Sequence, residues 1–200
     1  FLRSPLSHVS SVTITGNHFL TKQEIMKQSG IRTGMSFFGV KTIEIESNLH
    51  RLRAIKQVDL QKHFPSKLTI QIVEYPVVAY IQDEQTFIPL LANGAFLPTH
   101  PVTSMMKEMP IFEGWDQEKA SFSKLTSQFV QVPVSIRNQI VAIHPNESKP
   151  EQVVLWTRRG HKVEVRIDQL AERMKLYPKF LNQSPGTVHL LDSIWFTPGN

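Results

Sequence analysis

The sequence has no cysteine and no long apolar run among its 200 residues. Without cysteine there can be no disulfide framework, thiolate metal site or thiol nucleophile. A membrane-spanning helix needs roughly 18 or more apolar residues in succession, and no segment of this chain provides them. A chain of this length must therefore be held by a packed apolar core, in one domain or in two of about 100 residues each.

Sequence motifs of common catalytic and nucleotide-binding sites are also missing. The chain contains no GxGxxG, GxxxxGK[ST], GxSxG or HExxH pattern, and no two of its 8 histidines stand at the spacing of a metal site on a helix. Glu44 and Glu46 would point apart on a helix, while Asp116 and Asp168 are placed like helix caps. These absences predict a non-enzymatic binding module without a cofactor or bound metal.

The charge is basic but dispersed. The 22 Lys and Arg residues against 17 Asp and Glu give a formal charge of +5, and the closest basic runs are Arg51–Arg53 and Arg158–Arg159. Nucleic-acid-binding domains usually show a concentrated basic stripe, so no nucleic-acid partner is expected. Charge of this size supports only a weak attraction to an anionic surface.

The first 75 residues predict a small α+β unit. Val9–Thr15 alternates like a strand, and Thr21 with Glu24 forms a capping-box pattern for a helix that Gly30 ends. Apolar residues at helical spacing mark a second helix, and two alternating segments then flank a hairpin tip at 62–67. The order strand, helix, helix, strand, strand predicts one sheet with two helices on one face.

The second half, from Pro76 onward, predicts a larger sheet flanked by helices. Asn93–Gly94 is typical of a type I′ turn, and the prolines of 98–114 indicate a loop. Asp116 and Asp168 would each cap a helix, and the second helix has the clearest helical spacing in the chain, with Pro178 expected to kink or shorten it. The expected strands are 77–81, 87–91, 95–97, 140–144, 153–157, 162–167 and 187–191, with Trp156 in the core.

The segment 187–191 is expected to be the last strand and to lie at the edge of the sheet. An edge strand offers unpaired N–H and C=O groups to which a partner strand can add, and Trp195 and Phe196 follow as candidate anchors. On this hypothesis, proline at His189 abolishes partner binding. The residues alone leave open the alternative that this strand is interior and apolar on both faces.

A series of segments recurs in a known order along the chain: Ser4–Val9, Val12–Asn17, Gly34–Phe37, Phe64–Ile70, Glu74–Tyr80, Leu91–Pro98, Ala171–Pro178 and Val188–Leu190. Through this series the chain resembles the bacterial DivIB/FtsQ cell-division family, in its Gram-positive DivIB-like form. The resemblance implies an α+β chain with a membrane-proximal segment (1–8), a POTRA domain (9–75), a C-terminal mixed β-sheet domain flanked by helices, the β-domain (76–197), and the start of a tail (198–200). A membrane helix is expected before Phe1.

The resemblance also implies a function. Family members are non-catalytic divisome scaffolds, single-pass in the cell membrane with this region extracytoplasmic at the division septum. They bind DivIC/FtsB-type and FtsL-type proteins, with the septal penicillin-binding protein as a further candidate, and help to regulate septal peptidoglycan synthesis. No small-molecule substrate is implied.

The family's partner surface is the last strand of the β-domain and the neighbouring helix. Carried over, this predicts a partner-binding set of Val188, His189, Leu190, Leu191, Trp195, Phe196, Arg173, Lys175 and Tyr177. The chain departs from the family where many members read Asp-Leu-Arg, since it has Asp192-Ser193-Ile194. The alternatives are a POTRA-type polypeptide-transport component, a cell-wall polymer-binding module charged at +5, and an enzyme acting on wall polymer.

Overall fold

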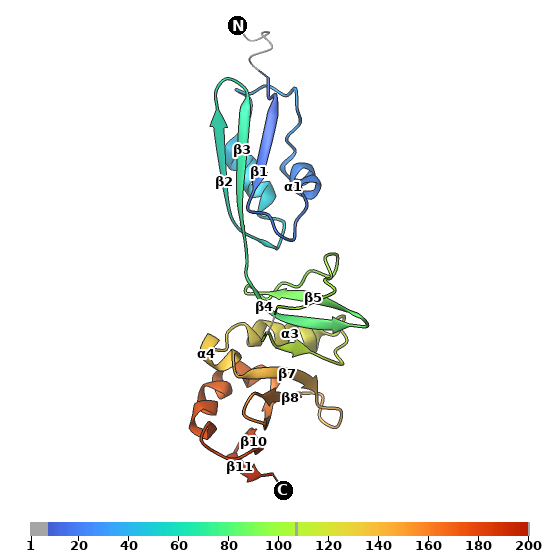
Figure 1. Cartoon of the computed structure of the whole chain (residues 1–200), viewed down its shortest axis with the longest axis vertical. Helices are drawn as coiled ribbons and strands as arrows, with labels where there is room; N and C mark the ends of the chain where they lie inside the picture. The colour runs from blue at the N-terminus through green and yellow to red at the C-terminus, as the bar shows by residue number, and fades with distance from the viewer. Residues whose placement is uncertain (1–7, 107, 200) are drawn as a thin grey trace. The chain divides into compact units, whose positions relative to one another are not determined.

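A computed structural model describes residues 8–106 and 108–199, and the chain divides into two compact units, Phe1–Tyr75 and Pro76–Asn200. We call them unit 1 and unit 2 and describe each by itself (Figure 1). Together they form the mixed α+β fold that the sequence predicts.

Unit 1 has a three-stranded sheet and two helices. Its elements are β1 (Ser11–Thr15), α1 (Lys22–Ser29), α2 (Thr42–Leu49), β2 (Ile55–His63) and β3 (Lys67–Glu74). The sheet order is β1-β3-β2, with β1 parallel and β2 antiparallel to β3. Alternate residues of β3 are buried with residues of both helices, namely Leu68, Ile70, Ile72, Ile25 and Leu49.

The predicted limits of the first helix are confirmed. The Thr21 side chain accepts a hydrogen bond from the Glu24 N–H at 3.2 Å, and the Glu24 carboxylate accepts one from the Thr21 N–H at 2.8 Å. Gly30 ends the helix with φ of 71°, a left-handed conformation that costs glycine little.

Unit 2 is built on an eight-stranded mixed sheet. Its strands are β4 (Val77–Asp83), β5 (Thr86–Leu91), β6 (Ile111–Phe112), β7 (Ile140–Pro145), β8 (Gln152–Thr157), β9 (His161–Arg166), β10 (Gly186–Leu190) and β11 (Ile194–Pro198). Their order in the sheet is β11-β10-β9-β8-β7-β6-β4-β5. Pairs β4–β6, β6–β7 and β9–β10 are parallel, and the others are antiparallel.

Helical segments cover one face of this sheet (Figure 1). They are α3 (Ala120–Phe129), α4 (Val134–Arg137), η2 (Ile167–Gln169), α5 (Leu170–Arg173) and η3 (Met174–Phe180), of which η2 and η3 are 3₁₀ helices. Phe122, Leu125 and Phe129, which lie at helical spacing on one face of α3, pack fully buried in the core with Phe112 of β6.

Two loop predictions are wrong. The loop predicted over 98–114 contains β6, whose two residues are too few to show alternation but pair between β4 and β7. Asn93–Gly94 does not form a type I′ turn, because Gly94 has φ of 81° but Asn93 is not among the described residues with positive φ. The Asn93 side chain instead accepts a hydrogen bond from the Ala95 N–H at 3.1 Å, and 95–97 contributes one isolated bridge rather than a strand.

Both predicted helix caps in unit 2 are also wrong. Lys119 precedes α3, while Asp116 accepts a hydrogen bond from the Glu118 N–H at 3.0 Å within the preceding turn. The long helix predicted from Asp168 is the series η2, α5 and η3, with Pro178 inside η3. Proline has no N–H and clashes with the preceding turn, so a regular α-helix is not maintained there.

Candidate partner-binding site

The open edge of the sheet at its C-terminal end is β11, not the predicted strand 187–191. β10 pairs in parallel with β9 on one side and antiparallel with β11 on the other. The expectation that β10 is free for a partner is therefore wrong, and proline at His189 would disturb pairing inside the sheet. Among the described residues, no strand lies beyond β11.

The register tells which backbone groups of β11 face outward. The Gly199 N–H donates to the Pro185 carbonyl at 2.9 Å. Bonded and non-bonded pairs alternate in an antiparallel ladder, so Thr197 and Trp195 bond with their partners on β10. The N–H and C=O groups of Ile194 and Phe196 then point to the open side.

The side chains of β11 divide between the two faces of the sheet. Trp195 is 44% exposed and stacks on His189, with ring centroids 4.3 Å apart and planes within 15°. Phe196 points to the core side, where its ring lies 6.1 Å from that of His161 and 6.5 Å from that of Phe180. The strand is thus fixed by Phe196 and presents Trp195 on the uncovered face.

Behind Trp195, a polar cluster spans β9 and β10. Glu164 accepts from Lys162 at 2.7 Å and pairs with His189 Nδ1 at 3.0 Å. Because a carboxylate only accepts, Nδ1 carries the hydrogen, and His189 Nε2 lies 3.3 Å from the Thr197 hydroxyl. Partial burial alone would raise the pKa of Glu164, but Lys162 and His189 outweigh it and the pKa lies below its ordinary value.

Three predicted partner-binding residues belong to the core. Val188, Leu190 and Tyr177 have no exposed surface. Val188 and Leu190 are the alternate residues that β10 turns toward the helices, and Tyr177 is buried on η3. Their predicted side-chain contact with a partner is therefore corrected: they support the sheet from within. Leu191 follows β10 and is half-buried.

Tyr177 belongs to a buried hydrogen-bond network. Its hydroxyl donates to Thr157 at 2.9 Å and lies 2.9 Å from His161 Nδ1. The other ring nitrogen of His161 faces the carbonyls of Gln183 and Ser184 at 3.2 and 3.1 Å, in the loop that leads to β10. Burial raises the pKa of the Tyr177 hydroxyl, so it stays protonated as a donor in this network.

The two predicted basic residues are held locally. Arg173 donates to Gln169 at 3.1 Å, and Lys175 pairs with Glu172 at 2.7 Å. These bonds stay within the helical segment 169–175. Neither of them reaches β11, whose Trp195 and Phe196 contact other rings. Arg173 and Lys175 line a hollow of about 460 Å³ together with Gln169, Glu172 and Leu176.

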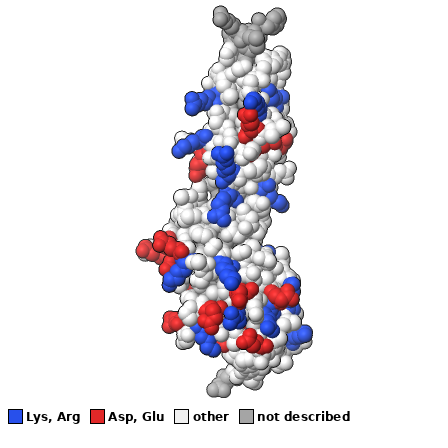
Figure 2. Space-filling view, turned by 180° about the vertical axis from the view of Figure 1, so that it is seen from behind, with Lys and Arg blue, Asp and Glu red and all other residues white. Residues whose placement is uncertain are grey.

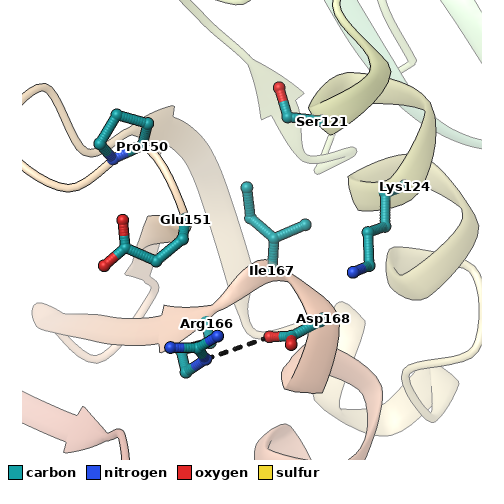
Figure 3. A pocket seen from close by; sticks show the side chains of 7 residues that line it. All are labelled: Ser121, Lys124, Pro150, Glu151, Arg166, Ile167 and Asp168. Atoms are coloured by element: carbon teal, nitrogen blue, oxygen red, sulfur yellow. Dashed lines mark hydrogen bonds and ion pairs between the residues drawn. The ribbon is translucent and has the colours of Figure 1, made fainter.

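A second hollow, of about 220 Å³, lies between α3 and the start of η2 (Figure 3). It carries both signs of charge, from Lys124, Arg166, Glu151 and Asp168. Arg166 donates to Asp168 at 3.3 Å and holds the pKa of that carboxyl below its ordinary value. Opposite charges that pair with each other leave no strong preference for a charged ligand.

Sequence reasoning missed β11 and placed Trp156 wrongly. The segment Ile194–Pro198 is rich in β-branched and aromatic residues and follows Leu190 after a short turn, which is a hairpin signal. Trp156 is 43% exposed because it lies on the uncovered face of β8. On that strand both Val153 and Val154 are buried, so alternation does not reveal which face is covered.

Within the part of the chain that the structure describes, no three His, Asp or Glu side chains gather as a metal site. In the same residues, no helix has the length and apolar character required to cross a bilayer.

Comparison with known proteins identifies the family. Residues 7–75 match the model of the FtsQ-type POTRA domain, and residues 79–194 match the C-terminal domain of the cell division protein FtsQ/DivIB. The chain belongs to the FtsQ/DivIB family. This confirms the resemblance drawn from the sequence segments.

Two relatives illustrate the match. Cell division protein DivIB of Bacillus cytotoxicus is 35% identical over 195 residues, covering 96% of this chain and 76% of the relative. DivIB of Bacillus subtilis is 28% identical over 203 residues, covering 98% and 76%. A solved structure of the major extracytoplasmic domain of DivIB from Geobacillus stearothermophilus covers 53% of this chain and 90% of its own, with 28% identity and a TM-score of 0.46.

Proposed function

We propose that this chain is the extracytoplasmic part of a non-catalytic divisome scaffold, carried by a single-pass protein of the septal membrane. It binds DivIC/FtsB-type and FtsL-type partners by strand addition and so helps to regulate septal peptidoglycan synthesis. Membership of the FtsQ/DivIB family supports the role in division. The observation that carries the binding mode is the open edge of β11.

In this mechanism a partner segment becomes the ninth strand of the sheet. Ile194 and Phe196 offer it their outward N–H and C=O groups, which follows from the register of β10 and β11. Main-chain hydrogen bonds supply affinity that tolerates changes of partner sequence, while side-chain pockets supply selectivity. Trp195, 44% exposed and held against His189, is the anchor on the uncovered face.

The decisive experiment compares Ile194→Pro with Ile194→Ala. Both lose the same half-exposed side chain, but only proline removes the outward N–H. Ile194 lies in a non-bonded pair with Leu190, so neither variant loses a hydrogen bond to β10. We expect Ile194→Pro to weaken binding of a DivIC/FtsB-type extracytoplasmic fragment by about tenfold or more, measured by calorimetry.

Ile194→Ala should bind within about twofold of the wild type, since side-chain truncation at an exposed position changes little. Circular dichroism and urea titration of both variants check that unit 2 is folded. If folded Ile194→Pro binds as tightly as Ile194→Ala, the partner does not use this edge.

A further inference from the structure

Unit 1 presents two aromatic side chains to solvent at one end. Phe64, at the tip of the β2–β3 hairpin, is 79% exposed, and Phe38, in the loop before α2, is 59% exposed. Single exposed apolar residues are common on protein surfaces. Two phenylalanines on neighbouring loops, each this exposed, are less easily explained by packing.

Both rings are held in place by a third. Phe37 is buried at 4% exposure, and its ring makes edge contacts with Phe38 at 5.7 Å and with Phe64 at 6.5 Å. The Lys62 ammonium lies 4.9 Å from the centroid of the Phe37 ring and donates to the Val40 carbonyl. The loop and the hairpin tip are thus joined into one surface, which we call the aromatic tip: Phe38 and Phe64 with Arg32, Lys62 and Lys67.

The charge of this surface has one sign. Arg32, Lys62 and Lys67 are exposed, and the segments 32–41 and 62–67 contain no Asp or Glu. The nearest acidic residues in sequence are Glu44, which is paired with Lys41 at 2.8 Å, and Asp59 on β2, which accepts a hydrogen bond from Gln61 at 2.7 Å. Figure 2 shows Lys and Arg side chains spread over unit 1, with fewer acidic ones between them.

The N-terminal part of the described chain lies at the same end of unit 1 (Figure 1). His8 forms a bridge with Ser36 beside Phe37, and the Ser10 N–H donates to the Ser66 carbonyl at 2.8 Å, next to the hairpin tip. The first described residue, His8, therefore lies beside the aromatic tip.

We propose that the aromatic tip of unit 1 binds the surface of an anionic lipid bilayer. Exposed Phe side chains insert at the boundary between headgroups and acyl chains, and Lys and Arg are attracted to anionic lipids. Exposed rings on two loops that carry Arg32, Lys62 and Lys67 but no Asp or Glu fit an anionic lipid surface better than a protein groove. The contact would fix the orientation of unit 1 on the membrane, and it uses no residue of the β11 edge.

The absence of native cysteine allows a direct test. Phe64→Cys can be labelled at this position alone with nitrobenzoxadiazole, whose emission shifts to the blue and brightens in lipid. Val134→Cys, in unit 2 at a position 60% exposed, is the matched control. We expect the label at 64 to respond to vesicles containing phosphatidylglycerol, to respond less at high salt, and to remain unchanged with phosphatidylcholine alone.

Sedimentation with the same vesicles measures affinity without a label. Phe38→Ser together with Phe64→Ser should weaken vesicle binding by about tenfold or more, and Lys67→Gln by about fivefold. Val134→Ser should leave it unchanged. Because all these side chains are exposed, the variants should keep the circular dichroism spectrum of the wild type.

The proposal is overturned if the label at 64 does not respond to anionic vesicles, or if the label at 134 responds equally. A response at 64 to a soluble division protein but not to vesicles would overturn it in favour of a protein partner. Neither result bears on strand addition at β11, which Ile194→Pro tests separately.

Discussion

The two edge strands of the eight-stranded sheet, β5 and β11, differ in how far their backbone groups are hydrogen-bonded. At one end, β5 is covered by the loop that follows it: Phe87 and Val102 exchange two hydrogen bonds of 2.9 Å, the Leu91 N–H donates to Ala95, and the Leu97 N–H donates to Pro89. At the other end, β11 has backbone bonds only on its β10 side among the described residues. An exposed edge invites unwanted pairing. This difference between the two edges supports the proposal that a partner strand adds to β11.

Gly186→Ala should have the largest effect of the variants considered, because it displaces the open edge strand β11. A methyl group at Gly186 would lie 2.4 Å from the Thr197 carbonyl oxygen and 2.8 Å from the Phe196 ring. The Thr197 carbonyl belongs to the backbone and cannot rotate away as a flexible side chain can. The added methyl group therefore forces β11 to move away from β10. We expect a loss of about 2–3 kcal/mol in the free energy of unfolding, measured by urea titration, and loss of partner binding.

Hydrogen exchange locates that effect. The Trp195 and Thr197 amides, which bond to β10, should lose protection while the Phe87 amide at the other edge keeps it. Gly39→Ala is the control, since the nearest atoms to its added methyl are 3.5 Å away. Wild-type stability of Gly186→Ala would contradict the pairing of β10 with β11.

Val102→Pro should leave part of the covered edge strand β5 without its hydrogen-bond partner, so that it resembles the open edge strand β11. It removes the N–H that occupies the Phe87 carbonyl, at a cost of about 1 kcal/mol for one hydrogen bond. We expect faster exchange of the Phe87 amide and greater self-association at high protein concentration, measured by light scattering. Val102→Ala, which keeps the N–H, should behave as the wild type. Equal behaviour of the two variants would mean that the loop does not protect this edge.

Much of the fold follows from local signals in the sequence. The capping box of Thr21 and Glu24 and the terminal Gly30 set the limits of α1 because cap chemistry is local. Alternation in β3 and helical spacing in α3 identify core faces for the same reason. The limits and core faces of these elements can therefore be predicted without knowing which distant residues pack against them.

The candidate site could be predicted only in part, because sheet order is not local. Alternation in Gly186–Leu190 indicates its faces but not which strands pair with it, so β10 was taken for the edge. Proline gives a partial local signal: Pro89 lies in the edge strand β5 and Pro198 in the edge strand β11, but Pro145 ends the interior strand β7. Proline has no N–H to donate to a neighbouring strand and is therefore found mainly in edge strands, at strand ends or at bulges.

The smallest expected effect comes from the polar cluster behind the open edge. The pKa of Glu164 is below its ordinary value of 4.5 in the folded chain, so its contribution to stability is present above about that pH and is lost as pH falls through the folded pKa. Glu164→Gln should therefore cost under about 1 kcal/mol near neutral pH, because the group is partly exposed, and the two proteins should converge in acid.

Urea titrations of wild type and Glu164→Gln from neutral pH down to acid measure this difference. Glu172→Gln is the control, since the Glu172 side chain is 78% exposed and bonds only to Lys175 on its own helical segment. The Glu164 cluster supports His189, on which Trp195 stacks, so the same loss should appear as weaker partner binding below the ordinary pKa. If the free energy of unfolding changes with pH in the same way for Glu164→Gln and the wild type, the polar cluster does not stabilise the open edge. The position of Trp195 would then depend on the pairing of β11 with β10 and on Phe196.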